Sequence, residues 1–244
     1  MGKKTPKYQR RRMRNHAAEN SKNGALISIL AMACLLFIFG FVAQSVAEGK
    51  SLAFDRSIIL ALREPGNPSA LIGPAWVQEA ARDLTSLGSI IVLAIITLSV
   101  AGYLFLERKH AVAWLMLAAV FGGIALNDLL KFAFARPRPD FVSPAARVFT
   151  TSFPSGHATL SAIVYLTIAA LLARSQSSSK VGLYFIVLAA LLTILIGVSR
   201  IYLGVHYPTD VLGGWCIGAA WALGCWVLMA RLGQGGQVES RGPT

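Results

Sequence analysis

Long runs of uncharged, mostly apolar residues constrain this chain more than any other feature of its sequence. Six such runs hold about 18 or more residues each: 23–47, 84–106, 110–127, 148–173, 181–199 and 211–230. A helix of about 20 apolar residues crosses a hydrocarbon core of roughly 30 Å, because each residue adds about 1.5 Å. The sequence therefore predicts an all-α, polytopic membrane protein with six transmembrane helices in one bundle: 24–47, 86–106, 111–134, 156–173, 181–201 and 209–231.

The composition supports this class and argues against two others. Only 14% of the residues are charged, 55% are hydrophobic, and the mean hydropathy is +0.59. A soluble domain carries about 25% charged residues, so a water-soluble globular enzyme is not expected, and abundant apolar runs exclude disorder. The cysteines Cys34, Cys216 and Cys225 lie within apolar runs and are interpreted as buried small side chains, without a disulfide or metal spacing.

The net charge of +12 is concentrated at the start of the chain, where eight of the 23 Lys and Arg residues occupy the first 22 positions. We interpret this stretch as an orientation signal that contacts anionic lipid, with no nucleic-acid partner. With the N-terminus inside, 14 Lys and Arg residues fall on the cytoplasmic side and nine outside. The expected organisation is a basic cytoplasmic tail (1–23), a six-span domain (24–231) and a cytoplasmic C-terminal tail (232–244).

Three stretches allow more than one interpretation. The first span (24–47) also fits a signal peptide, although its length and the lack of a clean cleavage site favour an uncleaved anchor. Within the outer connecting segment 48–85, the mixed residues that start at Trp76 fit an amphipathic interfacial helix or a plain loop equally well. The spacing Gly214-x3-Gly218 indicates close helix packing or the face of a homodimer.

Ionisable side chains near the lipid are concentrated in three segments at the ends of the predicted spans. These segments are 131–139 after the third span, 154–157 before the fourth, and 199–210 between the fifth and the sixth. Two complete spans separate the second segment from the third, so an even number of crossings brings all three to the same side. Charged residues are costly near lipid. Their convergence therefore predicts a single site at the outer membrane face.

The residue types in these segments fit a site for a phosphate group. Lys131, Arg138 and Arg200 supply three cations, and guanidinium groups bind phosphate oxygens through two parallel hydrogen bonds. Ser155 and Gly156 open a helix whose free N–H groups and positive dipole end favour an anion. Each cation alone also fits a side chain that snorkels to the interface, but their convergence favours a shared ligand.

Two histidines and one aspartate supply reactive groups. Asp210, in the first turn of a helix, can reach back to His206 and leave the other ring nitrogen as a nucleophile. Taken alone, Asp210 fits a helix-start acid equally well, and His157 is suited to protonate a departing oxygen. The nearby carboxylates, including Asp128 and Asp140, show no paired metal-ligand spacing, and three cations repel a divalent ion. No metal and no other cofactor is expected.

Together the three segments resemble the signature of the type-2 phosphatidic acid phosphatase superfamily. The motifs occur in order and without a departure at any motif position: Lys131-x6-Arg138-Pro139, Pro154-Ser155-Gly156-His157 and Ser199-Arg200-x5-His206-x3-Asp210. The six-span layout over 24–231 is similar to the integral-membrane bacterial branch of that superfamily. This resemblance implies a location in a bacterial cytoplasmic (inner) membrane, with the site facing the periplasm or the cell exterior.

The resemblance also implies a role for each motif residue. The histidine that matches His206 attacks phosphorus and forms a phosphohistidine, while the residue that matches Asp210 orients it. The histidine that matches His157 protonates the leaving group and then activates water. The residues expected to hold the phosphoryl oxygens, without a metal, are Lys131, Arg138, Ser155, Gly156 and Arg200.

The expected activity is hydrolysis of a lipid phosphate, such as phosphatidylglycerol phosphate, phosphatidic acid, undecaprenyl diphosphate or a lipid A-type phosphate. Transfer of the phosphoryl group to a sugar or glycolipid hydroxyl is the alternative, because the motifs do not encode the acceptor. A transporter or scaffold for an anionic lipid would account for the cations. It would not require His157, His206 and Asp210 together, and transporters place their charged residues nearer the midplane.

Overall fold

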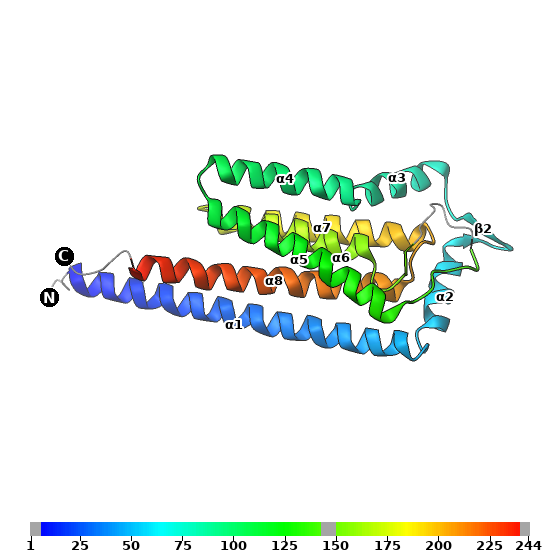
Figure 1. Cartoon of the computed structure of the whole chain (residues 1–244), viewed down its shortest axis with the longest axis horizontal. Coiled ribbons are helices and arrows are strands. Elements are labelled where there is room, and N and C mark those ends of the chain that lie inside the picture. Colours follow the sequence, from blue (N-terminus) through cyan, green and yellow to red (C-terminus); the bar gives the residue numbers. More distant parts are fainter. Residues whose placement is uncertain (1–5, 143–149, 240–244) are drawn as a thin grey trace.

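The computed structural model describes residues 6–142 and 150–239, with side chains for 26–142 and 150–229. The elements of this part of the chain are α1 (Pro6–Ala47), α2 (Leu52–Ala61), β1 (Arg63–Glu64), β2 (Asn67–Leu71), α3 (Ala75–Ser86), α4 (Ile90–Leu106), α5 (His110–Phe134), α6 (Gly156–Ser175), α7 (Ser179–Tyr202) and α8 (Pro208–Glu239). The long helices form one bundle, and α2, the hairpin β1–β2 and α3 gather at one end of it (Figure 1). The predicted helical membrane bundle is confirmed, with this antiparallel hairpin as a small addition.

Five helical stretches are long and apolar enough to cross a membrane: Leu26–Ala47 of α1, all of α5, α6 and α7, and Pro208–Met229 of α8. A sixth is the pair α3 and α4, which meet at a bend of 46°. The helix predicted over 86–106 thus begins later, at Ile90, because Ser89 caps α4 by accepting a hydrogen bond from the Val92 N–H. The residues from Trp76 onward are helical, which settles the open choice for that stretch in favour of a helix.

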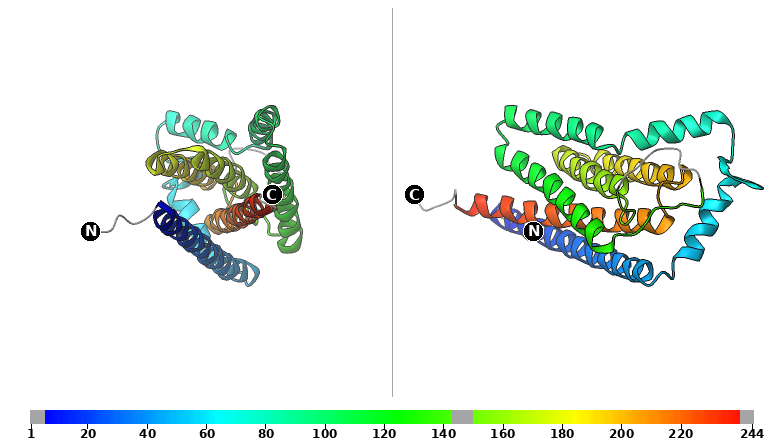
Figure 2. Two further views of the ribbon diagram at one scale, coloured as in Figure 1. Left: turned by 90° about the vertical axis from the view of Figure 1, so that its left-hand side faces the viewer. Right: turned by 45° about the vertical axis from the view of Figure 1, so that its right-hand side comes forward.

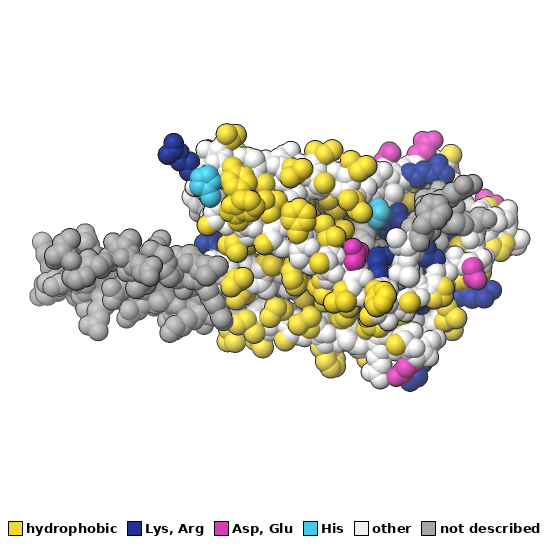
Figure 3. Space-filling view, viewed as in Figure 1, with side chains coloured by type: hydrophobic (Ala, Val, Ile, Leu, Met, Phe, Trp, Pro, Cys, Tyr) yellow, Lys and Arg dark blue, Asp and Glu magenta, His cyan; other side chains and the backbone are white. Residues whose placement is uncertain are grey.

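Apolar side chains cover the outside of the bundle, as lipid contact requires. Phe37, Ile91 and Phe132 are 77%, 73% and 84% exposed. In the space-filling view, hydrophobic side chains form a broad band over the helices, and charged side chains gather at the ends of the described body (Figure 3). A continuous apolar surface of this extent marks an interaction with a nonpolar environment.

The centre of the bundle is α6, which packs against α4, α5, α7 and α8. Its contact with α8 is close because α8 presents glycines to it. A Cβ on Gly218 would lie 2.5 Å from the Thr159 carbonyl oxygen, and one on Gly214 would lie 2.9 Å from the Ser155 carbonyl oxygen. These two glycines therefore serve packing between helices of one chain, while the homodimer itself stays a prediction.

The beginning of α1 and the end of α8 lie at the same end of the bundle, opposite α2 and α3 (Figures 1 and 2). In the predicted tails, α1 already begins at Pro6 and α8 continues to Glu239. The side chains of 1–23 and 230–244 lie outside the described residues, so the interpretation of the tails stays a prediction. The predicted site segments all lie at the end of the bundle away from these termini, as an outer site with two inner termini requires.

Replacement of Gly218 by alanine tests the contact between α6 and α8. The new Cβ meets a backbone carbonyl that cannot move aside freely, so we expect Gly218→Ala to destabilise the protein by about 1–3 kcal/mol. The matched control is Gly102→Ala, because a Cβ on Gly102 of α4 has no atom within 4 Å. Thermal unfolding in detergent measures both variants, and equal melting temperatures would contradict the close packing.

Candidate active site

The site forms where α5 and α7 end and where α6 and α8 begin. Lys131 lies in the last turn of α5, and Ala135, with φ of 43°, turns the chain out of the helix. Between α7 and α8 the turn uses Gly204 at φ +72°, a conformation in which glycine is not strained. Pro208 then starts α8 with its fixed φ. These turns bring the three predicted segments together.

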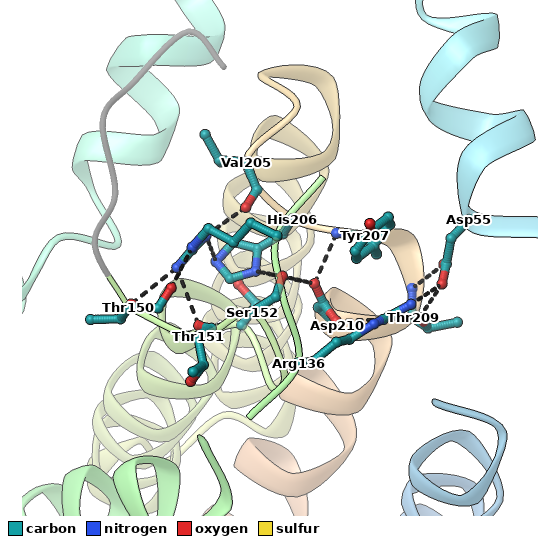
Figure 4. A network of polar contacts seen from close by, with 12 residues as sticks. Asp55, Arg136, Thr150, Thr151, Ser152, Val205, His206, Tyr207, Thr209 and Asp210 are labelled. Carbon is teal, nitrogen blue, oxygen red and sulfur yellow. Dashed lines mark hydrogen bonds and ion pairs between the residues drawn. The ribbon is translucent and has the colours of Figure 1, made fainter. Parts of the chain in front are cut away.

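Asp210 holds His206 from the first turn of α8. The Nδ1 atom of His206 lies 3.4 Å from Asp210 Oδ2, and the same oxygen accepts a hydrogen bond of 2.9 Å from the Tyr207 N–H. The Ser152 hydroxyl also donates to Asp210 Oδ2. His206 and Asp210 are 1% and 0% exposed. The imidazole is therefore fixed through Nδ1 within a buried network (Figure 4).

The other ring nitrogen of His206 faces Arg138. Nη1 of Arg138 lies 3.0 Å from His206 Nε2 and also donates to the Val205 carbonyl oxygen. A guanidinium group can only donate, so Nε2 must accept and Nδ1 must carry the ring proton toward Asp210. This tautomer is assigned from the hydrogen-bond partners. It leaves the Nε2 lone pair directed at the Arg138 guanidinium.

Burial is the main cause that lowers the pKa of His206, to about 3, and Arg138 and Arg200 add to it, whereas Asp210 opposes them. The imidazole is therefore neutral near pH 7. Burial also lowers the pKa of Arg138, against the attraction of Asp210. A neutral imidazole whose Nδ1–H is held by a carboxylate is the form of histidine that acts as a nucleophile.

The other two predicted cations, Lys131 and Arg200, lie at the same end of the bundle as His206 and Arg138. Lys131 Nζ donates to the Thr151 carbonyl oxygen at 2.6 Å. Arg200 is 4% exposed, and its Nη1 donates to the Thr85 hydroxyl at 2.9 Å while its Nε has no partner among the described residues. Within the described part of the chain, none of the three predicted cations is paired with a carboxylate. Their charge is available to a bound anion.

The N-terminus of α6 lies at the same end of the bundle, beside Lys131. Ser155 is the N-cap residue; its N–H donates to the Asp210 carbonyl oxygen at 3.0 Å, and its buried hydroxyl has no partner among the described residues. Gly156 lies beside Lys131, since a Cβ on it would be 3.8 Å from Lys131 Cε. A Cβ on Gly88, in the break between α3 and α4, would lie 3.3 Å from His157 Cδ2. An open helix N-terminus among unpaired cations suits a phosphate group.

All eight predicted site residues thus lie at one end of the bundle. His206 contacts both Asp210 and Arg138, and His157 lies within electrostatic reach of His206 and Arg200. Among the residues that the structure describes, no cluster of three or more His, Cys, Asp or Glu side chains is placed to hold a metal ion. The unpaired cations and helix N-terminus fit an anion.

Several residues of this network were not foreseen from the sequence, among them Asp55, Arg136, Ser152 and Thr209. Arg136 donates to Asp210 Oδ1 at 2.6 Å and to Asp55 Oδ2 at 2.7 Å. Arg136 occupies an unspecified position of the first motif, and Asp55 lies 81 residues away from it, in the connecting segment 48–85. No spacing rule joins two such residues. The available signal at Asp55 was weak: an aspartate, followed by Arg56 and Ser57, between two short apolar runs.

Comparison with known proteins agrees with the motifs. The model of the PAP2 superfamily matches residues 112–234. Phosphatidylglycerophosphatase B of Bacillus subtilis is 37% identical over 153 residues, which cover 62% of this chain and 74% of that protein. Lipid A 1-phosphatase of Rhizobium etli is 30% identical over 225 residues, which cover 82% and 86%. The crystal structure of a transmembrane PAP2-type phosphatidylglycerolphosphate phosphatase from B. subtilis matches with a TM-score of 0.71 and 29% identity, over 87% of this chain and 98% of that one.

The chain therefore belongs to the PAP2 superfamily, as the three motifs predicted. It is a phosphoric ester hydrolase of the membrane, in the class of the bacterial lipid phosphatases that it resembles. The coverage of the crystal structure extends this likeness from the motif segments to nearly the whole bundle.

The pH dependence of catalysis tests the state of His206. A nucleophilic His206 would act in its neutral form, which is lost only when the pH falls through the lowered pKa. We therefore expect the acid limb of kcat/KM to lie well below pH 6.5, the ordinary value for histidine. The profile is measured in detergent, and the titration of the substrate phosphate, measured separately by phosphorus NMR, is subtracted. A remaining acid limb near pH 6.5 would be inconsistent with a buried, neutral His206.

Proposed function

We propose that this enzyme removes the terminal phosphate of a membrane lipid through a phosphohistidine at His206. The observation that carries the proposal is the opposed pair of contacts on one imidazole. Nδ1 faces Asp210 at 3.4 Å, and Nε2 faces the guanidinium of Arg138 at 3.0 Å. A phosphate group held by Arg138 would therefore lie directly before the nucleophilic lone pair, and such placement accounts for a large share of catalysis.

The first half of the proposed reaction transfers the phosphoryl group to the protein. The phosphoryl oxygens take the place of His206 as partners of Arg138 and also bind Lys131 and Arg200. His206 Nε2 attacks phosphorus, so that a P–N bond forms while the bond to the lipid oxygen breaks. His157 gives its proton to that oxygen. Cations and N–H groups aimed at the phosphoryl oxygens stabilise the charge of the transition state.

The second half releases the phosphate. A water molecule attacks the phosphohistidine, the P–N bond breaks, and His157 takes a proton from the water. Asp210 holds the Nδ1 proton in place throughout, which keeps Nε2 as the leaving atom. The Ser155 and Gly156 end of α6 contributes N–H groups to the phosphoryl oxygens. We propose this route without a metal, because the groups before His206 are cations.

An apolar cavity beside His157 supports a lipid as the substrate. It has a volume of about 120 Å³ and lies between α4, α5 and α6. Leu160 and Val164, which lie three and seven residues after His157 on one side of α6, contribute to its wall, as do Leu93 and Ala94 of α4. We propose that a hydrocarbon chain of the lipid enters here from the bilayer while its phosphate reaches the cations.

The relatives support a lipid phosphate as the substrate class. One is named for phosphatidylglycerophosphate and another for lipid A, so the shared feature is a phosphate on a membrane lipid. We propose the same class here, and a location in a bacterial inner membrane with both termini in the cytoplasm. The site then faces the periplasm or the cell exterior, because it lies at the end of the bundle opposite the termini.

Substitution of His206 tests the proposed intermediate. With EDTA present, we expect the purified enzyme to release phosphate from at least one of phosphatidylglycerol phosphate, phosphatidic acid, undecaprenyl diphosphate and a lipid A phosphate. Labelled substrate should leave acid-labile, alkali-stable phosphate on the protein. His206→Ala should lack this label and lose activity by about 10⁴-fold or more. The control is His110→Ala, because His110 lies at the end of α5 away from the site. This variant should form the label and release phosphate as the native enzyme does.

Three outcomes of that experiment would change the conclusion. A labelled and active His206→Ala variant would remove His206 as the nucleophile. Loss of activity in EDTA, restored by a divalent metal, would overturn the metal-free route. Label that passes to an added sugar or glycolipid hydroxyl, with no release of phosphate, would favour the alternative activity of a phosphotransferase.

A bulky side chain in the apolar cavity tests the path of the lipid chain. Ala94→Trp fills part of the cavity, so that the lipid chain can bury about two fewer methylene groups there. This loss corresponds to about a tenfold higher KM for a long-chain lipid phosphate. Hydrolysis of p-nitrophenyl phosphate, which has no such chain, should not change. Ile95→Trp is the matched control, since Ile95 is the next residue of α4 and does not line the cavity. An equal effect of both variants on the lipid would contradict this path.

A further inference from the structure

We propose that Asp55 and Arg136 are positioning residues for the reaction, which hold and electrostatically balance the carboxylate that orients His206. They do so through a buried chain of charges, Asp55–Arg136–Asp210, that joins α2 to the start of α8. This inference rests on the proposed role of His206. It assigns a task in catalysis to the connecting segment 48–85, which lies outside the motifs.

The chain of charges is continuous and buried. Nη2 of Arg136 lies 2.7 Å from Asp55 Oδ2, and Nη1 lies 2.6 Å from Asp210 Oδ1. Asp55, Arg136 and Asp210 are 0%, 9% and 0% exposed. The guanidinium also lies over the ring of Tyr207, with its Cζ 4.1 Å from the ring centroid. Figure 4 shows Arg136 reaching between the two carboxylates. Buried charges are tolerated only when they are paired in this way.

The two oxygens of Asp210 have different partners. Oδ2 faces His206 Nδ1 and accepts from the Tyr207 N–H and the Ser152 hydroxyl, whereas Oδ1 accepts from Arg136. A carboxylate whose contacts all lie on one oxygen can still rotate about the Cβ–Cγ bond of the aspartate. Because Arg136 holds Oδ1, it fixes the carboxylate plane and keeps Oδ2 on the imidazole N–H. The position of His206 therefore depends on a residue that does not touch it.

Asp55 holds Arg136 and the start of α8 together. Its Oδ1 accepts a hydrogen bond of 3.0 Å from the Thr209 N–H, and its Oδ2 accepts one of 2.7 Å from the Thr209 hydroxyl. A carboxylate at a helix N-terminus is stabilised by the free N–H groups and the helix dipole. Asp55 thus caps the helix that carries Asp210 and, through Arg136, shares one cation with it.

The charges of this cluster also control how readily His206 takes a proton. Burial alone would lower the pKa of Arg136, but Asp210 and Asp55 raise it above its ordinary value, so the guanidinium stays charged. With Arg136 removed, two buried carboxylates lose their shared cation, one of them next to the imidazole, and the imidazolium form becomes more favourable. Removal of the Asp55 charge in the same protein reverses this effect. Simple docking of α2 would produce neither change.

Among the described residues, the other charged and titratable groups around His206 come from four places: Lys131 from α5, Arg138 from the segment after α5, His157 from α6 and Arg200 from α7. All four are retained in every variant used for the test. The substrate titrates identically with each variant as well. Differences in the acid limb between variants therefore report the Asp55–Arg136–Asp210 chain.

The test compares Arg136→Gln, Asp55→Asn and the double variant in the full-length, detergent-purified protein. We expect Arg136→Gln to lower kcat about 10²-fold with little change in KM. Its acid limb in kcat/KM should move upward by about one pH unit or more. Asp55→Asn should lower kcat without an upward shift, and the double variant should move the acid limb back toward the native position. Rates are normalised to the amount of acid-labile phosphoenzyme formed.

The matched control is Thr209→Val, which removes the hydroxyl that donates to Asp55 and accepts from Arg136 but changes no charge. It should lower the melting temperature and leave the acid limb in place. Should Arg136→Gln fail to fold, Arg136→Lys serves instead: the charge and the acid limb are retained, but the fork that spans both carboxylates is lost and kcat falls.

The proposal is overturned if the acid limb is the same in native, Arg136→Gln and double variants, or if Arg136→Lys keeps the native kcat. In that case Asp55 and Arg136 only dock α2. Failure of the proposed function is a separate result, because it is recognised by the absence of acid-labile phosphoenzyme in the native protein. A native phosphoenzyme combined with an invariant acid limb rejects this inference alone.

Discussion

The close contact between α6 and α8 is the interaction on which the rest of this site depends. Gly214 and Gly218 allow the two helix backbones to meet, and the Ser155 N–H then reaches the Asp210 carbonyl oxygen at 3.0 Å. The N-termini of two helices are thereby held side by side. One offers N–H groups to an anion, and the other carries the aspartate that orients His206. A larger side chain at either glycine would separate the N-terminus of α6 from Asp210 and His206.

The charges at this end of the bundle fall into two groups with different tasks. Lys131, Arg138 and Arg200 are bound to neutral oxygens and, within 26–142 and 150–229, are not paired with carboxylates, so they can bind an anion without first breaking such an ion pair. Arg136 is paired with two carboxylates and is not available to a ligand. Because Arg136 balances the charge of Asp210, the other three cations stay available to a phosphate group. The site can therefore attract an anion although a carboxylate oxygen lies 3.4 Å from His206.

The break between α3 and α4 contributes to the site as well as to the fold. Thr85, in the last turn of α3, accepts a hydrogen bond from Arg200, and Gly88 leaves room for the Ile196 side chain and for the neighbouring His157 ring. A straight helix through this stretch would carry the α3 residues away from α7. The bend instead lays α3 against α7, next to the end of that helix where Arg200 lies. The apolar cavity between α4, α5 and α6 begins at Ile90, immediately after this break.

The sequence by itself determined the membrane class, nearly all of the helices, the eight motif residues and the end of the bundle where they meet. These depend on local properties: the length of apolar runs, the spacing within motifs and the parity of membrane crossings. Only the tertiary structure decided that Arg136 joins Asp55 to Asp210, that Ser152 donates to the same carboxylate, and that the second span is broken before Ile90. Ion pairs between residues 81 positions apart leave no periodicity in a sequence, because they form only once separate helices have packed and excluded water from the charges between them.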